Sequence, residues 1–300
     1  MNKQSELIKM RYLTLRNIKL YFKDKMTFLV SLITPLILLV LFIAFLKSTY
    51  EDSILSIIQG FDLDQSLIDA LTGGWLFSSV LATSCITIAF CSGMMVIDKI
   101  NRANIDFMVS PVKKSTLQLS YVLANLFSTF IITFVLLIVG LIYLACVGFY
   151  ITFVDILLIV FGIIITSLFG TILANIIWTF THSQGVVSGV CTLVSALYGF
   201  ICGAYMPIST MGQGMQYFVS LLPGTYATVL FRQGFLNSVL NRMRETLPQG
   251  MINGIASGLD VKMSFFGHDV STLALILVIS ISTIVLLGVF LFINKFKKKN

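Results

Sequence analysis

Residues 119–178 read LSYVLANLFSTFIITFVLLIVGLIYLACVGFYITFVDILLIVFGIIITSLFGTILANIIW, and the only charged side chain among them is that of Asp155. They belong to a longer stretch, from Lys114 to Arg232, whose interior contains no other Asp, Glu, Lys or Arg. The surface of a water-soluble domain must be hydrated, whereas a charge at the centre of a bilayer costs at least about 2.5–3.5 kcal/mol. The stretch therefore predicts several helices that lie in lipid.

The composition extends this prediction to the whole chain. Of the 300 residues, 57% are hydrophobic and 11% are charged, and the mean hydropathy is +0.96. A spanning helix needs roughly 20 apolar residues, and runs such as Ile131–Ile142 lack the alternation of a transmembrane β-barrel. We predict an all-α integral membrane fold, a single transmembrane domain over residues 1–300, with six spans at 27–46, 75–97, 119–147, 153–178, 186–206 and 272–294.

The charges outside the spans predict the orientation. In the six-span topology, 15 of the 20 Lys and Arg residues share one side with four acidic residues, which gives that side a net charge of +11. The other side has five basic and nine acidic residues and a net charge of −4. Because Lys and Arg are enriched in cytoplasmic loops, both termini are expected in the cytoplasm. The net charge of +7 is thus an orientation signal, and no nucleic-acid partner is expected.

The segments that flank the first spans carry further patterns. Residues 1–26 predict a cytoplasmic amphipathic helix on the membrane surface, with a solvated basic leader as the alternative; its apolar face would hold Ile8, Leu15, Ile18 and Phe22. Pro35 should kink the first span or loosen one of its turns. An acidic outer loop is expected at 47–74, a charged inner loop at Asp98–Ser115, and a basic cytoplasmic tail at 295–300.

The first five spans, residues 27–206, are followed by the largest region outside the spans, residues 207–271. Its first part is apolar, but Gly-rich breaks and Pro223 divide it into two pieces, each too short to cross the bilayer. We expect re-entrant or interfacial helices there, on the outer side between the fifth and sixth spans. The remainder, Asn241–Ser271, is polar and contains glycine, which predicts a surface loop.

Hydroxyl and small side chains form stripes on two of the predicted spans. Hydroxyl groups recur every four residues on the second span, at Ser79, Thr83 and Thr87. Such groups line a path for amphipathic molecules, or bond to the carbonyl one turn back. Small residues allow helices to approach closely, so a stripe of them indicates packing within the subunit, a subunit interface or the wall of a pathway. On the fifth span six small residues lie within about 40° of one line: Gly185, Gly189, Thr192, Ala196, Gly199 and Gly203.

Few residues suggest chemistry. The five cysteines all fall in predicted spans, without a CxxC motif, and are expected to be small packing residues. His182 and His268 lie in predicted loops without metal-ligand spacing around them, so no metal site is expected. The chain has no Gly-Lys pair and hence no P-loop for nucleotide phosphates, and it has no GxSxG or HExxH motif. We expect neither a cofactor nor catalysis on this chain.

Three classes of membrane protein remain. An ion-coupled carrier should keep ionisable groups at mid-depth, but Asp155 falls near the outer end of its predicted helix. A channel should show a ring of charges or a filter loop, and the sequence shows neither. The third class is the membrane subunit of a transporter whose energy comes from a separate protein, which agrees with an uncharged core and a charged inner loop for docking.

Three short stretches carry a resemblance to a known family. They are Asp98–Val112 (DKINRANIDFMVSPV), Tyr205–Ser209 (YMPIS), and Leu222–Tyr226 (LPGTY), which is followed by Arg232. In this order, and with six spans and a basic leading segment, the chain resembles permeases of ATP-binding-cassette (ABC) transporters of the type-2 exporter family over essentially its whole length. It departs from the family pattern in having Asp98 where Glu is frequent and the Ala103-Asn104 pair where Gly is frequent. The polar stretch 241–271 is also longer than in many members.

The resemblance implies a half-transporter, not itself an enzyme, that pairs with a second copy or a related permease and with two cytoplasmic ATPase subunits that bind ATP and Mg²⁺. The inner loop would dock the ATPase through Asp98, Lys99, Arg102, Asp106 and Ser110. The translocation path or dimer face would use Ser79, Thr83, Thr87, Gly189, Thr192, Ala196, Gly199 and Gly203.

We expect export by alternating access across a bacterial cell (plasma) membrane, whose lipid surrounds the protein. The cargo implied by the resemblance is hydrophobic or amphipathic, and a drug or antimicrobial peptide is favoured because aromatic rings are few at the stripe positions. Lipid or lipid-linked polysaccharide is the alternative cargo. An ion-coupled secondary transporter is the alternative from another functional class.

Overall fold

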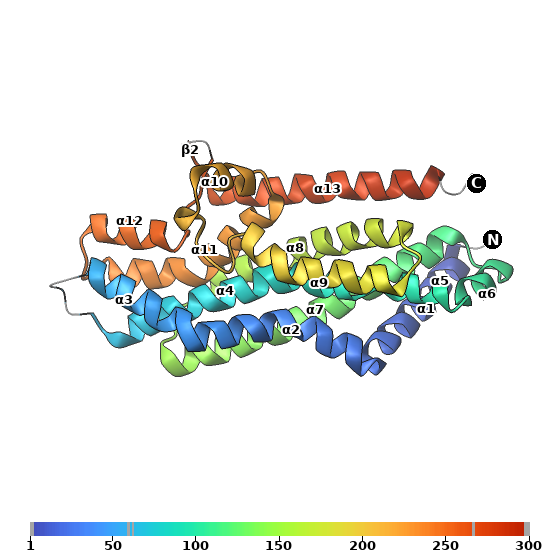
Figure 1. Cartoon of the computed structure of the whole chain (residues 1–300), viewed down its shortest axis with the longest axis horizontal. Helices are drawn as coiled ribbons and strands as arrows, with labels where there is room; N and C mark the ends of the chain where they lie inside the picture. The colour runs from blue at the N-terminus through green and yellow to red at the C-terminus, as the bar shows by residue number, and fades with distance from the viewer. Residues whose placement is uncertain (1–2, 59–60, 62, 266–267, 297–300) are drawn as a thin grey trace.

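Six helical segments that are long and apolar enough to cross a membrane run side by side in the computed structural model, which describes residues 3–58, 61, 63–265 and 268–296 (Figure 1). They confirm the predicted number of spans and the all-helical class; two-residue strands are the only sheet in the described part of the chain. The segments are Lys25–Ile57, Gln65–Ile100, Lys114–Val147, Phe153–Phe180, Gln184–Ile201 and Thr272–Lys295.

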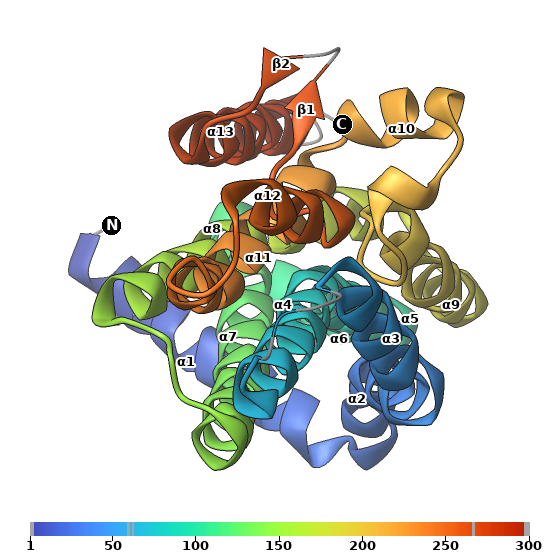
Figure 2. The same cartoon turned by 90° about the vertical axis from the view of Figure 1, so that its left-hand side faces the viewer.

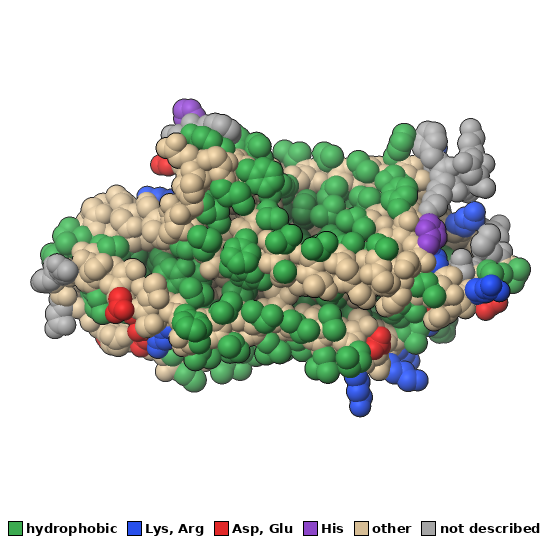
Figure 3. Space-filling model, in the orientation of Figure 1, with side chains coloured by type: hydrophobic (Ala, Val, Ile, Leu, Met, Phe, Trp, Pro, Cys, Tyr) green, Lys and Arg blue, Asp and Glu red, His purple; other side chains and the backbone are tan. Residues whose placement is uncertain are grey.

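The two ends of this bundle differ. We call the end with both chain termini and the short helices α5 (Met94–Ile100) and α6 (Ala103–Val109) the inner end, and the opposite end the outer end (Figure 1). On the face drawn in Figure 3, hydrophobic side chains cover the middle of the bundle, while Lys, Arg, Asp and Glu gather toward the two ends. An apolar band between two charged rims is the surface that a bilayer requires.

The chain enters the bundle through a sharp bend. Helix α1 (Lys3–Lys23) is followed by Asp24, whose carboxylate caps α2 (Lys25–Leu41) by accepting hydrogen bonds from the backbone N–H groups of Met26 and Thr27 at 3.2 and 3.3 Å. The hydroxyl of Thr27 also donates to Asp24, and this bond lowers the pKa of the carboxyl. The helix continues through Pro35, and the irregular turn lies further on, in the π-helix η1 (Phe42–Leu46).

The expected acidic loop 47–74 is wrong over most of its length. Helix α3 (Lys47–Ile57) prolongs the first span, and α4 (Gln65–Cys91) begins about ten residues before the predicted second span. The added helical turns pair the backbone N–H and C=O groups of these residues with each other. Asp64 caps the start of α4, because its carboxylate accepts a hydrogen bond from the N–H of Ser66 at 3.1 Å. Lys47 also pairs with Asp69 across the two helices at 3.1 Å, which holds the extended ends together.

Helix α4 is the central helix of the bundle, because every residue from Leu67 to Cys91 except Asp69 is buried. Two glycines allow neighbouring backbones to approach it. A Cβ atom on Gly74 would lie 3.3 Å from the carbonyl oxygen of Phe235, and one on Gly170 would lie 2.9 Å from that of Cys85. The inner end of α4 breaks at Ser92 and Gly93, before α5.

Helices α7 (Lys114–Val147) and α8 (Phe153–Phe180) form a hairpin at the outer end. Thr152 caps α8 in a reciprocal capping box with Asp155: the N–H of Asp155 donates to the Thr152 hydroxyl, and the Thr152 N–H donates to the Asp155 carboxylate at 3.0 Å. Ser238, on another helix, donates to the same carboxylate. The one charge in the uncharged stretch is therefore a helix cap at the outer end.

The outer segment is more regular than its sequence suggested. The expected surface loop at Asn241–Ser271 is wrong, because α11 runs through Asn241 and further helix and strand follow. Figure 2 looks onto this end and shows α12 in front of α11 and α10 to one side. The elements are η2 (Ile208–Thr210), α10 (Gln213–Ser220), α11 (Pro223–Met243), α12 (Gln249–Gly258), β1 (Ser264–Phe265), β2 (His268–Asp269) and α13 (Thr272–Phe296).

Helix α11 is buried along most of its length, against α4, α8 and α13. Pro223 occupies its first turn, where the missing N–H has no helical partner to lose, so the proline starts this helix. Helix α11 follows the short α10, which agrees with the prediction that Pro223 divides the apolar part of this segment into two pieces. Of the predicted basic tail, residues 295–300, only residues 295 and 296 belong to the part of the chain that the structure describes.

Candidate functional site

A buried carboxylate joins four helices at the inner end. Asp98, on α5, accepts hydrogen bonds from both terminal nitrogens of Arg16 on α1, at 2.6 and 3.0 Å. The hydroxyl of Tyr121 on α7 donates to the same carboxylate at 2.6 Å. The guanidinium of Arg16 lies 5.2 Å from the ring centre of Phe107 on α6. We call these four residues the inner clamp.

The inner clamp is a strong contact because of its geometry. Two parallel charge-assisted hydrogen bonds match the guanidinium fork to the carboxylate, and the bond to Asp98 raises the pKa of Arg16 above its ordinary value. Asp98 is only 4% exposed. Of the five residues predicted to dock an ATPase, Asp98 thus has its carboxylate engaged inside the chain.

Lys99 is engaged in a similar way. Its ammonium group donates to the backbone carbonyls of Trp178, Thr179 and Thr181, at 2.7, 3.1 and 3.1 Å. These carbonyls lie at the C-terminal end of α8 and at its C-cap Thr181, and a cation is favoured at the negative end of a helix dipole. Lys99 therefore attaches α5 to the inner end of α8.

The remaining three predicted docking residues lie on or beside α6. Arg102 and Asp106 are exposed, and Arg102 adopts a left-handed backbone conformation (φ 60°) at the start of α6. Ser110 is half-buried, and its hydroxyl donates to the carbonyl of Phe107 at 2.8 Å. Of the predicted docking set, Asp98 and Lys99 therefore bind other parts of the chain, Arg102 and Asp106 are exposed, and Ser110 lies at the end of α6.

Helix α1 is bound to the bundle at further points. Thr116 on α7 donates to Glu6 at 2.7 Å, and this bond lowers the pKa of the Glu6 carboxyl. Lys9 donates to the backbone carbonyl of Pro111 at 2.6 Å. The side chains of Thr14 and Asn17 are buried in the chain, whereas α1 also carries exposed large apolar residues: Leu7, Ile8, Tyr12 and Leu15.

A second buried ion pair, the outer clamp, lies at the opposite end. Arg232 on α11 is fully buried and donates to the carboxylate of Asp260 at 3.0 Å and to the backbone carbonyl of Gly203 at 2.5 Å. Its guanidinium lies 5.1 Å from the ring centre of Trp75 on α4. A buried arginine needs such partners, because an unpaired charge in the interior is costly.

Asp260 completes the outer clamp from the turn after α12. It has a positive φ of 50°, and its carboxylate accepts from the backbone N–H groups of Ile208 and Ser209, the latter at 3.3 Å. The stretch YMPIS and the Arg232 that follows LPGTY, both part of the family resemblance, therefore meet here. Asp260 was not identified from the sequence. One signal pointed to such a residue, because Arg232 lies in a mostly apolar segment and a buried arginine requires an acidic partner.

The predicted stripe on the fifth span divides into two parts. Helix α9 ends at Ile201, so the prediction that Gly203 belongs to the helical face is wrong: Gly203 lies beyond the end, with a φ of 71° that favours glycine. Gly199 is buried, and a Cβ atom there would clash with the ring of Tyr205. The other four residues of the stripe, Gly185, Gly189, Thr192 and Ala196, are exposed on the outside of the chain.

The hydroxyl stripe of the second span lies elsewhere. Ser79, Thr83 and Thr87 are at most 1% exposed inside the chain. The hydroxyl of Thr83 donates to the Ser79 carbonyl one turn back, at 2.9 Å, as the alternative interpretation of this stripe expected. The structure therefore does not bring the α4 stripe and the exposed part of the α9 stripe onto one common surface.

Cys91 and Cys191 form a disulfide between α4 and α9, with their Cα atoms 5.5 Å apart. The expectation that all five cysteines are packing residues is wrong for these two. Their separation of 100 residues leaves no local motif by which the sequence could reveal the pair. Among the described residues, no group of three His, Cys, Asp or Glu side chains is arranged to hold a metal ion.

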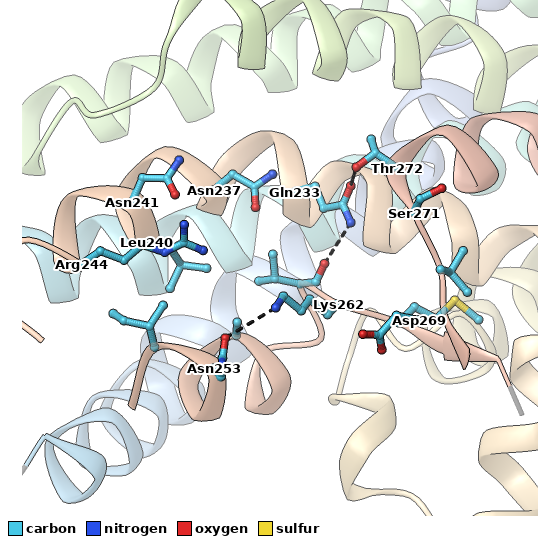
Figure 4. Close-up of a pocket in the computed structure, with 15 residues that line it drawn as sticks. Gln233, Asn237, Leu240, Asn241, Arg244, Asn253, Lys262, Asp269, Ser271 and Thr272 are labelled. Carbon is cyan, nitrogen blue, oxygen red and sulfur yellow. Dashed lines mark hydrogen bonds between the residues drawn. The ribbon is translucent and has the colours of Figure 1, made fainter. Parts of the chain in front are cut away.

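Three cavities surround α12. One of about 420 Å³ lies between α11, α12 and the segment 261–272, and we call it the outer polar cavity (Figure 4). A second, of about 540 Å³, shares four of its lining residues and extends toward α10. A third, of about 430 Å³, lies between α3 and α12 and has mainly apolar walls. The residues shared by the first two are Asn253, Lys262, Met263 and Asp269.

The outer clamp yields a prediction about stability. Replacing Arg232 by Met leaves the carboxylate of Asp260 buried without its counter-ion, which costs about 3–5 kcal/mol. The control is Arg242→Met, which breaks the exposed pair of Arg242 with Glu245 (2.8 Å), a contact worth about 0–1 kcal/mol. Thermal unfolding of the purified protein in detergent should show a much larger fall in the midpoint for Arg232→Met, and equal falls would contradict the role given to the outer clamp.

Comparison with known proteins assigns the chain to a family. A model of the family described as ABC-2 type transporter matches residues 9–236, a region that contains most of α1, the inner clamp, the first five spans and Arg232. No curated protein and no solved structure matches the chain. The match covers more than half of the sequence, and in such transporters ATP binds to separate ATPase subunits. The chain belongs to the ABC-2 type transporter family, as a multi-pass permease subunit and not as the ATPase.

Proposed function

We propose that this permease is one half of an ATP-driven exporter that works by alternating access. The observation that supports this best is the position of the charges, because in the described spans Asp, Glu, Lys and Arg lie near the ends of the helices. An ion-coupled carrier, the alternative from another class, requires protonatable or ion-binding groups at mid-depth. Energy from a partner ATPase removes that requirement.

The orientation follows from the same charges. The inner end, with the excess of Lys and Arg, faces the cytoplasm of a bacterial cell, and both termini lie there. Helix α1 lies on the inner membrane surface, because it turns Thr14 and Asn17 into the bundle and leaves the apolar face with Ile8 and Leu15 exposed. Helices α10 and α11 form the re-entrant pair on the outer side.

The inner end receives the ATPase. Arg102 and Asp106 are exposed at the turn into α6 and at its first turn, and they supply charged contacts for a cytoplasmic partner. Asp98 and Lys99, one turn away, pass a displacement of α5 to α1, α7 and α8 through the inner clamp and the α8 carbonyls. Ser110 holds the end of α6 by its bond to Phe107.

Helix α9 forms the face toward a second permease copy or a related permease. Its exposed surface combines the small residues Gly189, Thr192 and Ala196 with larger ones such as Leu193 and Leu197, and nothing lies within 4 Å of the position of a Cβ atom on Gly189. Helix α13 is also widely exposed, but with large side chains such as Leu273 and Ile284, which suit contact with lipid. Small residues favour close contact between helices instead.

The cargo is a hydrophobic or amphipathic compound, with a drug or antimicrobial peptide favoured. It passes along the α9 face when two subunits meet there, and movement of α4 against α9 opens or closes the route. Lipid or lipid-linked polysaccharide is the second candidate cargo. A wide sugar path needs aromatic platforms, and the exposed stripe of α9 offers Gly, Thr and Ala instead.

Transport in proteoliposomes tests the proposed function. Liposomes that contain the permease and its ATPase should move an amphipathic fluorescent drug only when ATP is supplied on the side of α5 and α6. A pH or sodium gradient without the ATPase should move none, because the spans carry no mid-depth ionisable group. Gradient-driven accumulation by the permease alone would instead establish the ion-coupled alternative.

Charge reversal tests the docking surface. The double variant Arg102→Glu and Asp106→Lys should lower co-purification with the ATPase several-fold, since contacts across an interface depend on complementary charge. Lys295→Glu is the control, because Lys295 is also an exposed charge at the inner end but lies on α13. Retention of the ATPase by the double variant, or equal loss in the control, would place the docking surface elsewhere.

Leucine substitution tests the α9 face. Gly189→Leu should leave folding unchanged, because the position has open space around it, but should abolish pairing of two permeases and ATP-driven export. Gly288→Leu on α13 is the matched control, since nothing lies within 4 Å of that position either and it faces lipid in this proposal. Cross-linking in membranes measures pairing, and wild-type cross-linking by Gly189→Leu would exclude α9 from the interface.

A further inference from the structure

The outer polar cavity has no role in the proposed export cycle, although its walls are unusually rich in amide and charged groups. Helix α11 lines one wall with Gln233, Asn237, Asn241 and Arg244, and the opposite wall includes Asn253 of α12, Lys262 and Asp269 (Figure 4). The α11 residues Gln233, Asn237 and Asn241 recur every four positions, so one face of this helix presents them together.

The basic residues of the outer side that form no ion pair in the described part of the chain both line this cavity. Five basic residues lie on that side. Lys47, Arg232 and Arg242 each have an acidic partner, at 3.1, 3.0 and 2.8 Å. Within the described residues, Arg244 and Lys262 have no such partner, and both line the outer polar cavity. The only bond of the Lys262 ammonium found there is a long one, 3.5 Å to the amide oxygen of Asn253.

Hydrogen-bond donors lie beside these cations. The side chain of Gln233 is already engaged, because it donates to the carbonyl of Val261 at 3.1 Å and accepts from Thr272 at 2.8 Å. The amides of Asn237 and Asn241 have no partner among the residues that the structure describes. Two amides and two cations on facing walls form a set of donors that suits an anion.

The arrangement favours phosphate over other anions. A carboxylate offers two oxygens and is satisfied by one guanidinium, whereas Arg244 and Lys262 come from separate walls and suit a group with oxygens on several sides. Asp269 lines the far end of the cavity and repels a second anionic group there (Figure 4). Thr272 lines the cavity and is the first residue of α13, the sixth candidate span, so the proposed topology puts the cavity at the outer membrane surface, next to the lipid head groups.

We infer that the outer polar cavity binds a single phosphate group, with Arg244 and Lys262 as its cationic contacts and Asn237 and Asn241 as hydrogen-bond donors. The group belongs either to the head group of a phospholipid in the outer leaflet or to a soluble phosphate compound. This inference concerns binding at the outer surface and does not depend on the direction of transport or on the cargo.

Binding to the purified full chain in a phosphate-free detergent tests the inference. One arm titrates inorganic phosphate by calorimetry, and the other measures adducts of short-chain phosphatidylglycerol by native mass spectrometry. The double variant Arg244→Gln and Lys262→Gln should weaken binding at least about tenfold, as expected when charge-assisted hydrogen bonds are lost. Asp269→Asn should strengthen binding several-fold, because it removes a repelling charge.

Arg242→Gln is the matched control, since it removes the same charge two residues from Arg244 but outside the cavity. If the wild-type chain binds inorganic phosphate and the double variant does not, the ligand is a soluble phosphate compound. If the wild-type chain binds only phosphatidylglycerol, the ligand is the lipid. The inference is overturned if the wild-type chain binds neither probe, if the double variant binds as the wild type does, or if Arg242→Gln weakens binding equally.

Discussion

Hydrocarbon offers no hydrogen bonds to a charged side chain, so a charge inside a membrane protein must find its partners within the chain. This constraint accounts for the arrangement of the bundle at both ends. At the inner end the carboxylate of Asp98 is bound by Arg16 and Tyr121, and at the outer end the guanidinium of Arg232 is bound by Asp260 and a backbone carbonyl. Between the two clamps the helices are held by apolar packing around α4 and by the disulfide of Cys91 with Cys191.

The two clamps connect parts of the chain that are far apart in the sequence. The inner clamp binds the leading helix to the short helices that face the proposed ATPase. The outer clamp binds α11 to the turn after α9 and to the turn after α12. Helix α4 contacts the outer clamp through Trp75, and its continuation α5 carries Asp98. A displacement at one end therefore has a continuous route of helix and ion pair to the other.

The sequence predicted the features that depend on composition along one helix, and it failed where partners come from distant segments. The six spans follow from runs of apolar residues, and the position of Asp155 at an outer helix end follows from its place in one such run. Asp260 and the pair of Cys91 with Cys191 could not be identified in this way, because each meets its partner only through the fold. Helix α12 was missed because its glycines and polar residues resemble a loop. Gly203 was misplaced because its angular position fits the stripe, although a glycine at this point also indicates a helix end.

The attachment of α9 limits how this helix can move. In its inner half it is joined covalently to α4 through Cys191, and just beyond its outer end the carbonyl of Gly203 is held by Arg232. The side of α9 that carries Gly189, Thr192 and Ala196 is exposed. A rod tethered at one flank and beyond its outer tip cannot slide lengthwise while these tethers persist, but it can rock through a limited arc about its own long axis. Rocking of this kind would turn one flank of α9 and then another toward the midline of a paired assembly.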